Sequence, residues 1–351
     1  MNSDSPNALD RALIDLLAKK IAATRSRSDL RADNLDGVLQ AAGVPAFVWE
    51  SVLTSCAAAT ATTEVAVNST ASRKVTIVGG RGEMGRWFAD RLRYWGHGVQ
   101  LMGRKDWDRA ETLLGEADLV LISVPIDRTV EIIREAAPYL KPDTVLADIT
   151  SIKGPIVAAM LEAHPGPVLG LHPMFGPGVT SFLSQKVVVC PGREMPECQW
   201  FIDFIANDGG ETIECPPEEH DRMMVAVQAL RHFATFGLGV FLGLENVDIG
   251  RSLDFASPIY RVAIDMVSRL FAQDGALYVE IMLATPERRA AIARLAETFV
   301  SLSELVQQEN KAELMAQFDR TRATFGNETD RALEESDRLI NALSIILAAQ
   351  T

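Results

Sequence analysis

Two polar residues that follow apolar runs are candidates for proton-transfer chemistry. His172 lies in the run VLGLHP at 168–173, where Pro173 favours an extended backbone before it. Ser151 follows the run TVLADI at 144–149. A neutral imidazole near pH 7 can act as a general base, so His172 is a candidate catalytic residue. Ser151 either belongs to the same site or only caps the helix expected at 155–163.

A glycine-rich segment at 80–85 has the pattern G-x-G-x-x-G and directly follows the β-branched run KVTIV. Glycines in this pattern permit a tight turn, close approach of a pyrophosphate and close packing of helix on strand. The positive N-terminus of the helix that follows attracts the phosphate charge. The surrounding runs favour a dinucleotide site over a merely structural glycine turn. The expected cofactor contacts here are Gly80, Gly82, Glu83, Met84 and Gly85.

The segment LMGRKD at 101–106 bears on which dinucleotide binds. The acidic residue that usually ends the second strand and binds the ribose is replaced by Gly103, and Arg104 follows it. A small residue followed by an arginine suits a 2′-phosphate, so we expect NAD or NADP with tolerance of NADP. In the alternative, Arg104 only stacks on the adenine and Asp106 binds the ribose.

The C-terminal half places basic residues within apolar helical patterns. Arg261 and Arg269 are eight residues apart, about two helical turns, and so share a helix face. Two arginines among apolar residues indicate a dicarboxylate site, although pairing with Asp265 or Asp274 is the alternative. His232 lies in QALRHF at 228–233 and is either a pocket residue or a satisfied core histidine.

Short apolar runs alternate with helical patterns up to about residue 215, after which the strand signals stop. This predicts a Rossmann-like α/β domain over 73–215, with a mainly parallel sheet, and an all-helical domain over 216–351. Residues 1–56 are expected to be helical and 57–72 to form a linker. The helical pattern around Met223–Leu242 is apolar on most sides, as in a helix buried in a dimer core.

Charge, cysteine pattern and hydropathy exclude several classes of protein. The 351 residues include 34 Lys and Arg against 47 Asp and Glu, a net charge of −13, which argues against nucleic-acid binding. The four cysteines contain no CxxC pair, so no metal site is expected. Neither a signal peptide nor an uninterrupted membrane-spanning run is evident, so we expect a cytoplasmic protein that does not bind membranes.

Several long sequence words together resemble the prephenate dehydrogenase family, and in particular the dehydrogenase part of the bifunctional chorismate mutase–prephenate dehydrogenases, the T-proteins. The resemblance covers about residues 74–340. It rests on VGGRGEMGR, DWDRAE, LISVPI, TSIK, PVLGLHPMFGP, EHDRMM, QALRHFATF, SPIYR and RLFAQD.

The resemblance implies a dinucleotide domain, a helical dimerisation domain and a substrate between them. It implies that His172 accepts a hydrogen bond from the substrate's 4-hydroxyl, that Ser151 supports this contact and that Arg269 binds the ring carboxylate. Further positions match the family pocket and the nicotinamide side of the cofactor site; they are His232, Arg261, Gln273, Ser123 and Pro125. The expected reaction is the NAD(P)-dependent oxidative decarboxylation of prephenate to 4-hydroxyphenylpyruvate by a homodimer.

Two departures from the family pattern shape the alternatives. Gly103 stands where the T-proteins have an acidic residue. The segment LIDLLAKKIAATRSR resembles the first mutase helix, but the residues that would complete a mutase pocket are absent, so residues 1–56 are expected to be an inactive remnant. The lost mutase also keeps 4-amino-4-deoxyprephenate open as the substrate. A non-catalytic dinucleotide-binding regulator is the alternative from another class.

Overall fold

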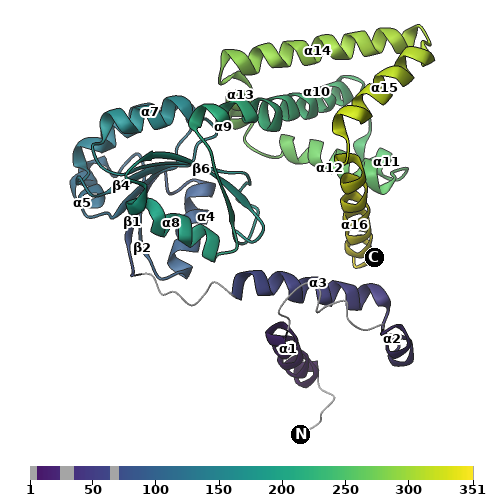
Figure 1. Ribbon diagram of the computed structural model, residues 1–351, viewed down its shortest axis with the longest axis horizontal. Coiled ribbons are helices and arrows are strands. Elements are labelled where there is room, and N and C mark those ends of the chain that lie inside the picture. The colour runs from purple at the N-terminus through teal and green to yellow at the C-terminus, as the bar shows by residue number, and fades with distance from the viewer. Residues whose placement is uncertain (1–5, 24–34, 64–70, 351) are drawn as a thin grey trace. The chain divides into compact units, whose positions relative to one another are not determined.

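The computed structural model describes residues 6–23, 35–63 and 71–350. The chain forms two units, Met1–His220 and Asp221–Thr351. The first unit contains a seven-stranded sheet with flanking helices, and the described part of the second is helical throughout (Figure 1). The expected division into an α/β part and a helical part is therefore present, and the boundary between the two units falls within helix α9 (Pro217–Met224).

The sheet of the first unit has the strand order β2-β1-β3-β4-β5-β6-β7. The first five strands in the chain run parallel, β6 pairs antiparallel to β5, and β7 is parallel to β6. Every residue of β3, β4 and β5 is buried, as expected for strands covered on both faces. The strands are β1 Lys74–Val78, β2 Gly98–Met102, β3 Leu119–Ile122, β4 Val145–Asp148, β5 Val168–Pro173, β6 Lys186–Arg193 and β7 Glu211–Glu214.

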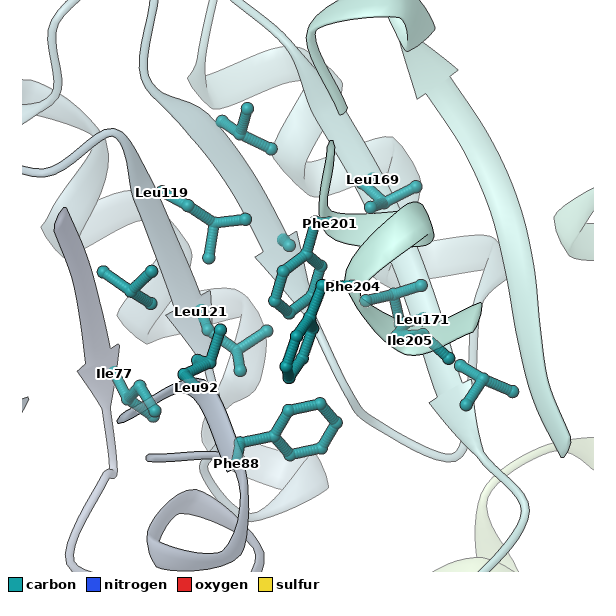
Figure 2. Close-up of a cluster of buried hydrophobic side chains, with 14 of the residues drawn as sticks. Ile77, Phe88, Leu92, Leu119, Leu121, Leu169, Leu171, Phe201, Phe204 and Ile205 are labelled. Carbon is teal, nitrogen blue, oxygen red and sulfur yellow. The ribbon is translucent and has the colours of Figure 1, made fainter. Parts of the chain in front are cut away.

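Helices cover both faces of this sheet. On one face, α4 (Glu83–Tyr94) and α8 (Met195–Asn207) bury an aromatic cluster that includes Phe88, Phe201 and Phe204 (Figure 2). The opposite face is covered by α5 (Ala110–Gly115), α6 (Ile126–Ala136) and α7 (Gly154–Ala163). Short 3₁₀ segments precede α5 and follow α6; they are η2 Trp107–Arg109 and η3 Ala137–Tyr139.

Strand β7 has no counterpart in the sequence prediction. Its sequence ETIE contains one strongly apolar residue, and none of its residues is buried. A short, exposed edge strand contains no apolar run that would predict it from the sequence. Only the pairing with β6 in the sheet identifies β7 as a strand.

The described residues of the N-terminal region form the helices α1 (Pro6–Ala23), α2 (Asp36–Ala42) and α3 (Ala46–Thr63). Helix α3 continues into the segment 57–72 that was predicted to be a linker. Its alanine-rich end, CAAATATT, lacks glycine and proline, and alanine has the highest helix propensity, so nothing local stops the helix at residue 56.

The second unit begins with a long helical run. Helix α9 continues through η4 (Val225–Leu230), a π-helical segment, into α10 (Arg231–Leu244). The run Pro217–Leu244 is long and apolar enough to cross a membrane by length and composition, although Gln228, Arg231 and His232 interrupt its apolar residues. The remaining helices are α11 Ile249–Leu253, α12 Pro258–Phe271, α13 Gly275–Leu283, α14 Pro286–Gln307, α15 Lys311–Phe325 and α16 Glu328–Ala348.

Candidate active site

The strand order reverses between β1 and β3, which is where open α/β sheets bind their ligands. The carboxyl ends of these strands are held together, because the Ser123 N–H donates to the Val78 carbonyl over 2.8 Å. The backbone turns sharply at Gly79, whose φ is +80°. A Cβ at Gly79 would lie 2.0 Å from the Ser123 carbonyl oxygen, so the turn requires glycine.

The three motif glycines have different surroundings. A Cβ at Gly80 would lie 2.7 Å from the Ile77 carbonyl oxygen, and one at Gly85 would lie 2.7 Å from the Cα of Gly80. A Cβ at Gly82 would meet only the Gly79 carbonyl, at 3.3 Å, and otherwise open space. Protein packing thus explains two of the glycines, whereas the space beside Gly82 fits the close approach of a pyrophosphate.

Gly82 is the N-cap residue of α4, and the positive end of the helix dipole therefore lies at this loop. Glu83 and Met84 form the first turn of α4. Across the switch point, Ser123 is half-buried and Pro125 is the N-cap residue of α6. The loop, the helix N-terminus and the end of β3 thus bring all of these expected cofactor contacts to one edge of the sheet.

The end of β2 holds a small charged cluster. The Gly103 N–H donates to Asp106 Oδ2 over 2.8 Å, and Arg81 pairs with the same carboxylate at 2.9 Å. The Gly103 N–H first, and then the nearby Arg81, hold the pKa of Asp106 below its ordinary value. Arg104 is exposed. The Asp106 carboxylate therefore lies beside Gly103, close to where the acidic residue that usually ends the second strand would place its carboxylate.

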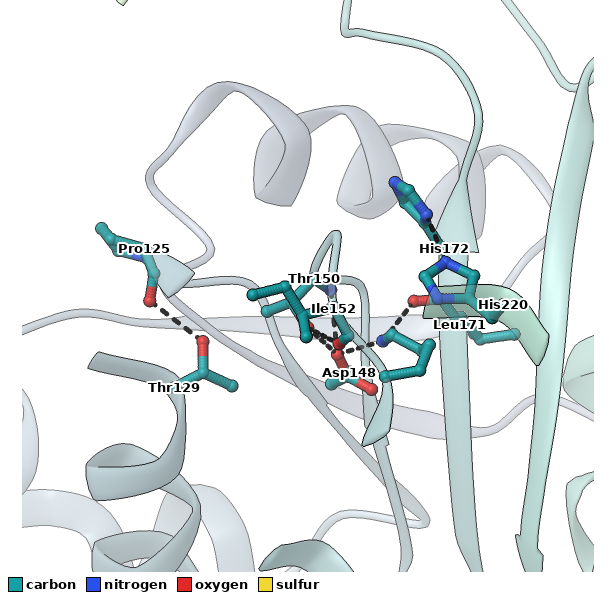
Figure 3. A network of polar contacts seen from close by, with 9 residues as sticks. Pro125, Thr129, Asp148, Thr150, Ile152, Leu171, His172 and His220 are labelled. Carbon is teal, nitrogen blue, oxygen red and sulfur yellow. Dashed lines mark hydrogen bonds and ion pairs between the residues drawn. The ribbon is translucent and has the colours of Figure 1, made fainter. Parts of the chain in front are cut away.

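His172 is buried at the carboxyl end of β5, and its Nδ1 lies 2.7 Å from Nε2 of His220 (Figure 3). His220 belongs to α9 and is buried as well. One ring of this pair must donate the proton and the other accept it, so the contact fixes the orientation of His172 and couples the tautomers of the two rings.

A buried ion pair supports the strand that carries His172. Lys153 Nζ pairs with Asp148 Oδ2 at the end of β4 and donates to the Leu171 carbonyl over 2.7 Å. Both charged side chains are completely buried. The Thr150 N–H also donates to Asp148, at 2.9 Å. This network ties the loop containing Ser151 to β5 beside His172.

Ser151 lies shortly before helix α7. This helix begins at Gly154, and its N-cap residue is Lys153, whose side chain forms no capping hydrogen bond. Ser151 is partly exposed at the carboxyl end of β4. Lys153 rather than Ser151 is therefore the N-cap residue, and Ser151 stays a candidate site residue.

In the second unit, the structure groups two of the predicted pocket residues around Tyr278. The Tyr278 hydroxyl donates to Gln273 Oε1 over 2.6 Å, and its ring packs edge-on against His232 at 4.8 Å between centroids. His232 is buried in α10, and this burial lowers its pKa to about 4, with Arg231 and Arg288 acting in the same direction. His232 is thus neutral at physiological pH.

Arg261 and Arg269 both lie on α12, as predicted. Within residues 71–350 neither forms an ion pair with Asp265 or Asp274, and Asp274 instead caps α13 by accepting from the Ala276 N–H. Arg269 is exposed, and its charge opposes the burial that raises the pKa of Tyr278. The charge of Arg269 is therefore not neutralised by Asp265 or Asp274. It lies near Tyr278, which contacts Gln273 and His232.

Four residues of these sites escaped the sequence analysis as functional candidates: Arg81, Lys153, His220 and Tyr278. Arg81, Lys153 and His220 appeared only within longer sequence words, and Tyr278 lies in none of these words. The partners of Arg81 and His220 lie far along the chain; His172 and His220 are 48 positions apart. Among the described residues, no group of three His, Cys, Asp or Glu side chains could hold a metal ion.

Both units of the chain match domains of a known protein family. The sequence model of the prephenate dehydrogenase nucleotide-binding domain matches residues 92–212, and that of the prephenate dehydrogenase dimerization domain matches residues 216–320. A T-protein of Enterobacter agglomerans is 38% identical over 97% of this chain and 96% of its own length. The T-protein of Haemophilus influenzae is 36% identical over 95% and 94%, respectively.

A solved structure has the same fold. Prephenate dehydrogenase from A. aeolicus, in complex with hydroxyphenyl propionate and NAD+, is 21% identical, with a TM-score of 0.56 over 73% of this chain and 98% of that one. The fold and the switch-point site define a dinucleotide-binding oxidoreductase. With the matches to both family domains, the chain belongs to the prephenate dehydrogenase family.

Proposed function

We propose that this protein catalyses the NAD(P)-dependent oxidative decarboxylation of prephenate to 4-hydroxyphenylpyruvate. The observation that carries the proposal is the buried His172–His220 pair, because it lies at the same carboxyl edge of the sheet as the glycine loop. A base at that edge can reach a substrate presented to a cofactor bound across the switch point. Family membership supports the same activity.

Prephenate is a cyclohexadienol with a carboxylate on its quaternary ring carbon. When bound, the nicotinamide cofactor accepts the hydride that leaves C4. Positive charge then develops on the ring, carbon dioxide departs, and the ring becomes aromatic. His172 stabilises the developing charge by accepting a hydrogen bond from the 4-hydroxyl, and Ser151 supports that contact.

This role requires an unprotonated ring nitrogen on His172. If Nδ1 of His172 carries the proton and donates it to Nε2 of His220, then Nε2 of His172 is the unprotonated nitrogen, which is the form that can accept a hydrogen bond from the substrate. We therefore assign His220 as a positioning residue that selects this tautomer. The Lys153 bond to the Leu171 carbonyl holds the strand end in place.

Arg269 binds the ring carboxylate, and Arg261, His232 and Gln273 complete the substrate-binding set. A guanidinium stays charged and forks onto carboxylates, so it positions the departing group without protonating it. Because His232 is neutral, it contributes hydrogen bonding rather than charge.

Tolerance of NADP is part of the proposal. Gly103 replaces the strand-end carboxylate that would ordinarily repel a 2′-phosphate, and the nearby Asp106 carboxylate is paired with Arg81, with Arg104 beside it. The test is kcat/KM for each cofactor. A preference for NAD above about 100-fold, which corresponds to about 2.7 kcal/mol, contradicts this part of the proposal.

We also propose a homodimer formed through the second unit. Helix α10 exposes several large apolar side chains, and the second unit matches a dimerization domain. The exposed residues of α10 are Leu238, Val240, Phe241 and Leu244. An apolar helix in this domain then serves a subunit interface rather than a membrane, in a cytoplasmic enzyme. A monomer in sedimentation experiments at micromolar concentration would contradict this.

The N-terminal helices are proposed to be an inactive mutase remnant. Chorismate rearrangement requires several cations around a dianion, yet α2 and α3 contain neither lysine nor arginine. Three of the arginines of this region, Arg25, Arg27 and Arg31, lie outside the described residues.

Steady-state kinetics with prephenate and 4-amino-4-deoxyprephenate, each with NAD and NADP, test the function directly. Reduction of the cofactor with formation of 4-hydroxyphenylpyruvate is the expected result. A higher kcat/KM for the amino substrate would assign the enzyme to that reaction instead. Tight cofactor binding without turnover of either substrate would indicate the non-catalytic regulator.

A further inference from the structure

Arg81 occupies an unusual place in the glycine loop. It is the first variable residue of G-x-G-x-x-G, yet its side chain extends to the end of β2. A Cβ built on Gly103 would lie 3.2 Å from Arg81 Nη1 and 3.6 Å from its guanidinium carbon. The guanidinium thus lies directly over the position where a dinucleotide fold ordinarily has its ribose-binding carboxylate.

The partner of this guanidinium is Asp106. Its carboxylate accepts from the Gly103 N–H and pairs with Arg81, while Arg81 itself is about half exposed, at 58% of its side-chain area. Asp106 is more enclosed, at 15%. One anion is therefore fixed to the backbone by the Gly103 amide, and a solvent-facing cation is held against it.

We propose that Arg81, rather than Arg104, binds the 2′-phosphate of the cofactor, and that Asp106 competes with this phosphate for the guanidinium. The inference rests on the cofactor tolerance proposed above. A phosphate dianion offers Arg81 a stronger, bidentate partner than a single carboxylate. Asp106 remains bound to the Gly103 N–H, where it accepts from the ribose of NAD. The pair thereby accommodates both cofactors.

Arg104 differs from Arg81 in what holds it. It is exposed, and within residues 71–350 no hydrogen bond or ion pair holds its guanidinium in place. Arg81, in contrast, already lies over the open glycine. Since a guanidinium positioned in advance loses less side-chain freedom on binding, Arg81 is the better phosphate ligand.

Calorimetric binding of adenosine 2′,5′-bisphosphate and of AMP tests the proposal without turnover, because the two ligands differ only in the 2′-phosphate. Arg81→Ala is expected to weaken bisphosphate binding by about 10- to 100-fold while AMP binding changes less than about threefold. Asp106→Asn keeps an oxygen for the Gly103 N–H but removes the competing charge. It is expected to tighten bisphosphate binding several-fold, and this gain should vanish in the double variant.

Arg93→Ala is the control, because Arg93 lies on α4, the helix that follows the glycine loop, and, like Arg81, pairs with an aspartate, in this case the exposed Asp90. It should leave both affinities unchanged. Equal losses for both ligands in Arg81→Ala would show a structural role and overturn the inference. Loss of bisphosphate binding in Arg104→Ala but not in Arg81→Ala would also overturn the inference. The separate proposal that the enzyme tolerates NADP would then still stand. If the native enzyme proves strictly NAD-dependent, the absence of any gain in Asp106→Asn overturns the inference as well.

Discussion

Lys153→Met is expected to destabilise the protein strongly and to impair catalysis at a distance. Lys153 is completely buried, as is its partner Asp148, and its ammonium also donates to the Leu171 carbonyl beside His172. Methionine has a similar length and fills the space, so the substitution removes the charge and the hydrogen bonds while leaving little cavity.

The expected loss in the free energy of unfolding follows from the unpaired Asp148 carboxylate that Lys153→Met leaves in the core. The Asp148 carboxylate keeps the Thr150 N–H but loses its only cation among the described residues. Leaving a buried charge unpaired typically costs about 3–5 kcal/mol. Lys186→Met is the matched control, because Lys186 pairs with Glu211 at the surface with both side chains more than half exposed. Such surface pairs contribute about 0–1 kcal/mol.

Urea denaturation of the full chain, followed by fluorescence, measures the free energy of unfolding of each variant. A second variant, Lys153→Met with Asp148→Asn, removes both charges and should recover part of the loss, because no unpaired carboxylate remains. If Lys153→Met cost no more than Lys186→Met, the buried pair would not support the site. If the double variant were less stable than the single one, the cost of burying an unpaired carboxylate would not be the cause.

Four further predictions concern the site. His172→Asn should lower kcat by roughly 10²–10⁴ with little change in substrate binding and abolish the acidic limb of the pH profile; an unchanged kcat and limb would make His232 the next candidate. Arg269→Ala should act mainly on KM, and the fall in kcat/KM should correspond to a loss of about 2–4 kcal/mol of transition-state stabilisation; a loss confined to kcat would contradict its role as an anion ligand. With chorismate, the protein should form no prephenate above the uncatalysed rate, and deleting residues 1–56 should preserve dehydrogenase turnover; measurable rearrangement would show an active mutase. Burial lowers the pKa of His232 to about 4, below its unfolded value near 6.5, so the unfolded state binds the extra proton and stability should fall as pH drops from 6.5 towards 4; His232→Asn should flatten this dependence in unfolding experiments, and an unchanged slope would assign it to other groups.

The sequence alone indicated the order of elements in the first unit because the signals are local. Runs such as KVTIV and ADLVLISVP are mostly apolar rather than alternating, which is typical of buried parallel strands. The edge strand β7 was missed for the opposite reason, since an exposed strand of four residues has no apolar run. The end of α3 was placed too early because an alanine-rich segment resembles a linker in composition while favouring a helix.

The glycine motif and the family words therefore follow from sequence, since each depends on neighbouring residues. The tertiary structure alone brought Arg81 over Gly103, Asp106 onto the Gly103 amide and His220 against His172. The first and last of these contacts join residues far apart in the chain, and strand order and register determine which side chains meet there. Local periodicity carries no information on such pairings, because it reports which face of an element is buried and not what lies opposite.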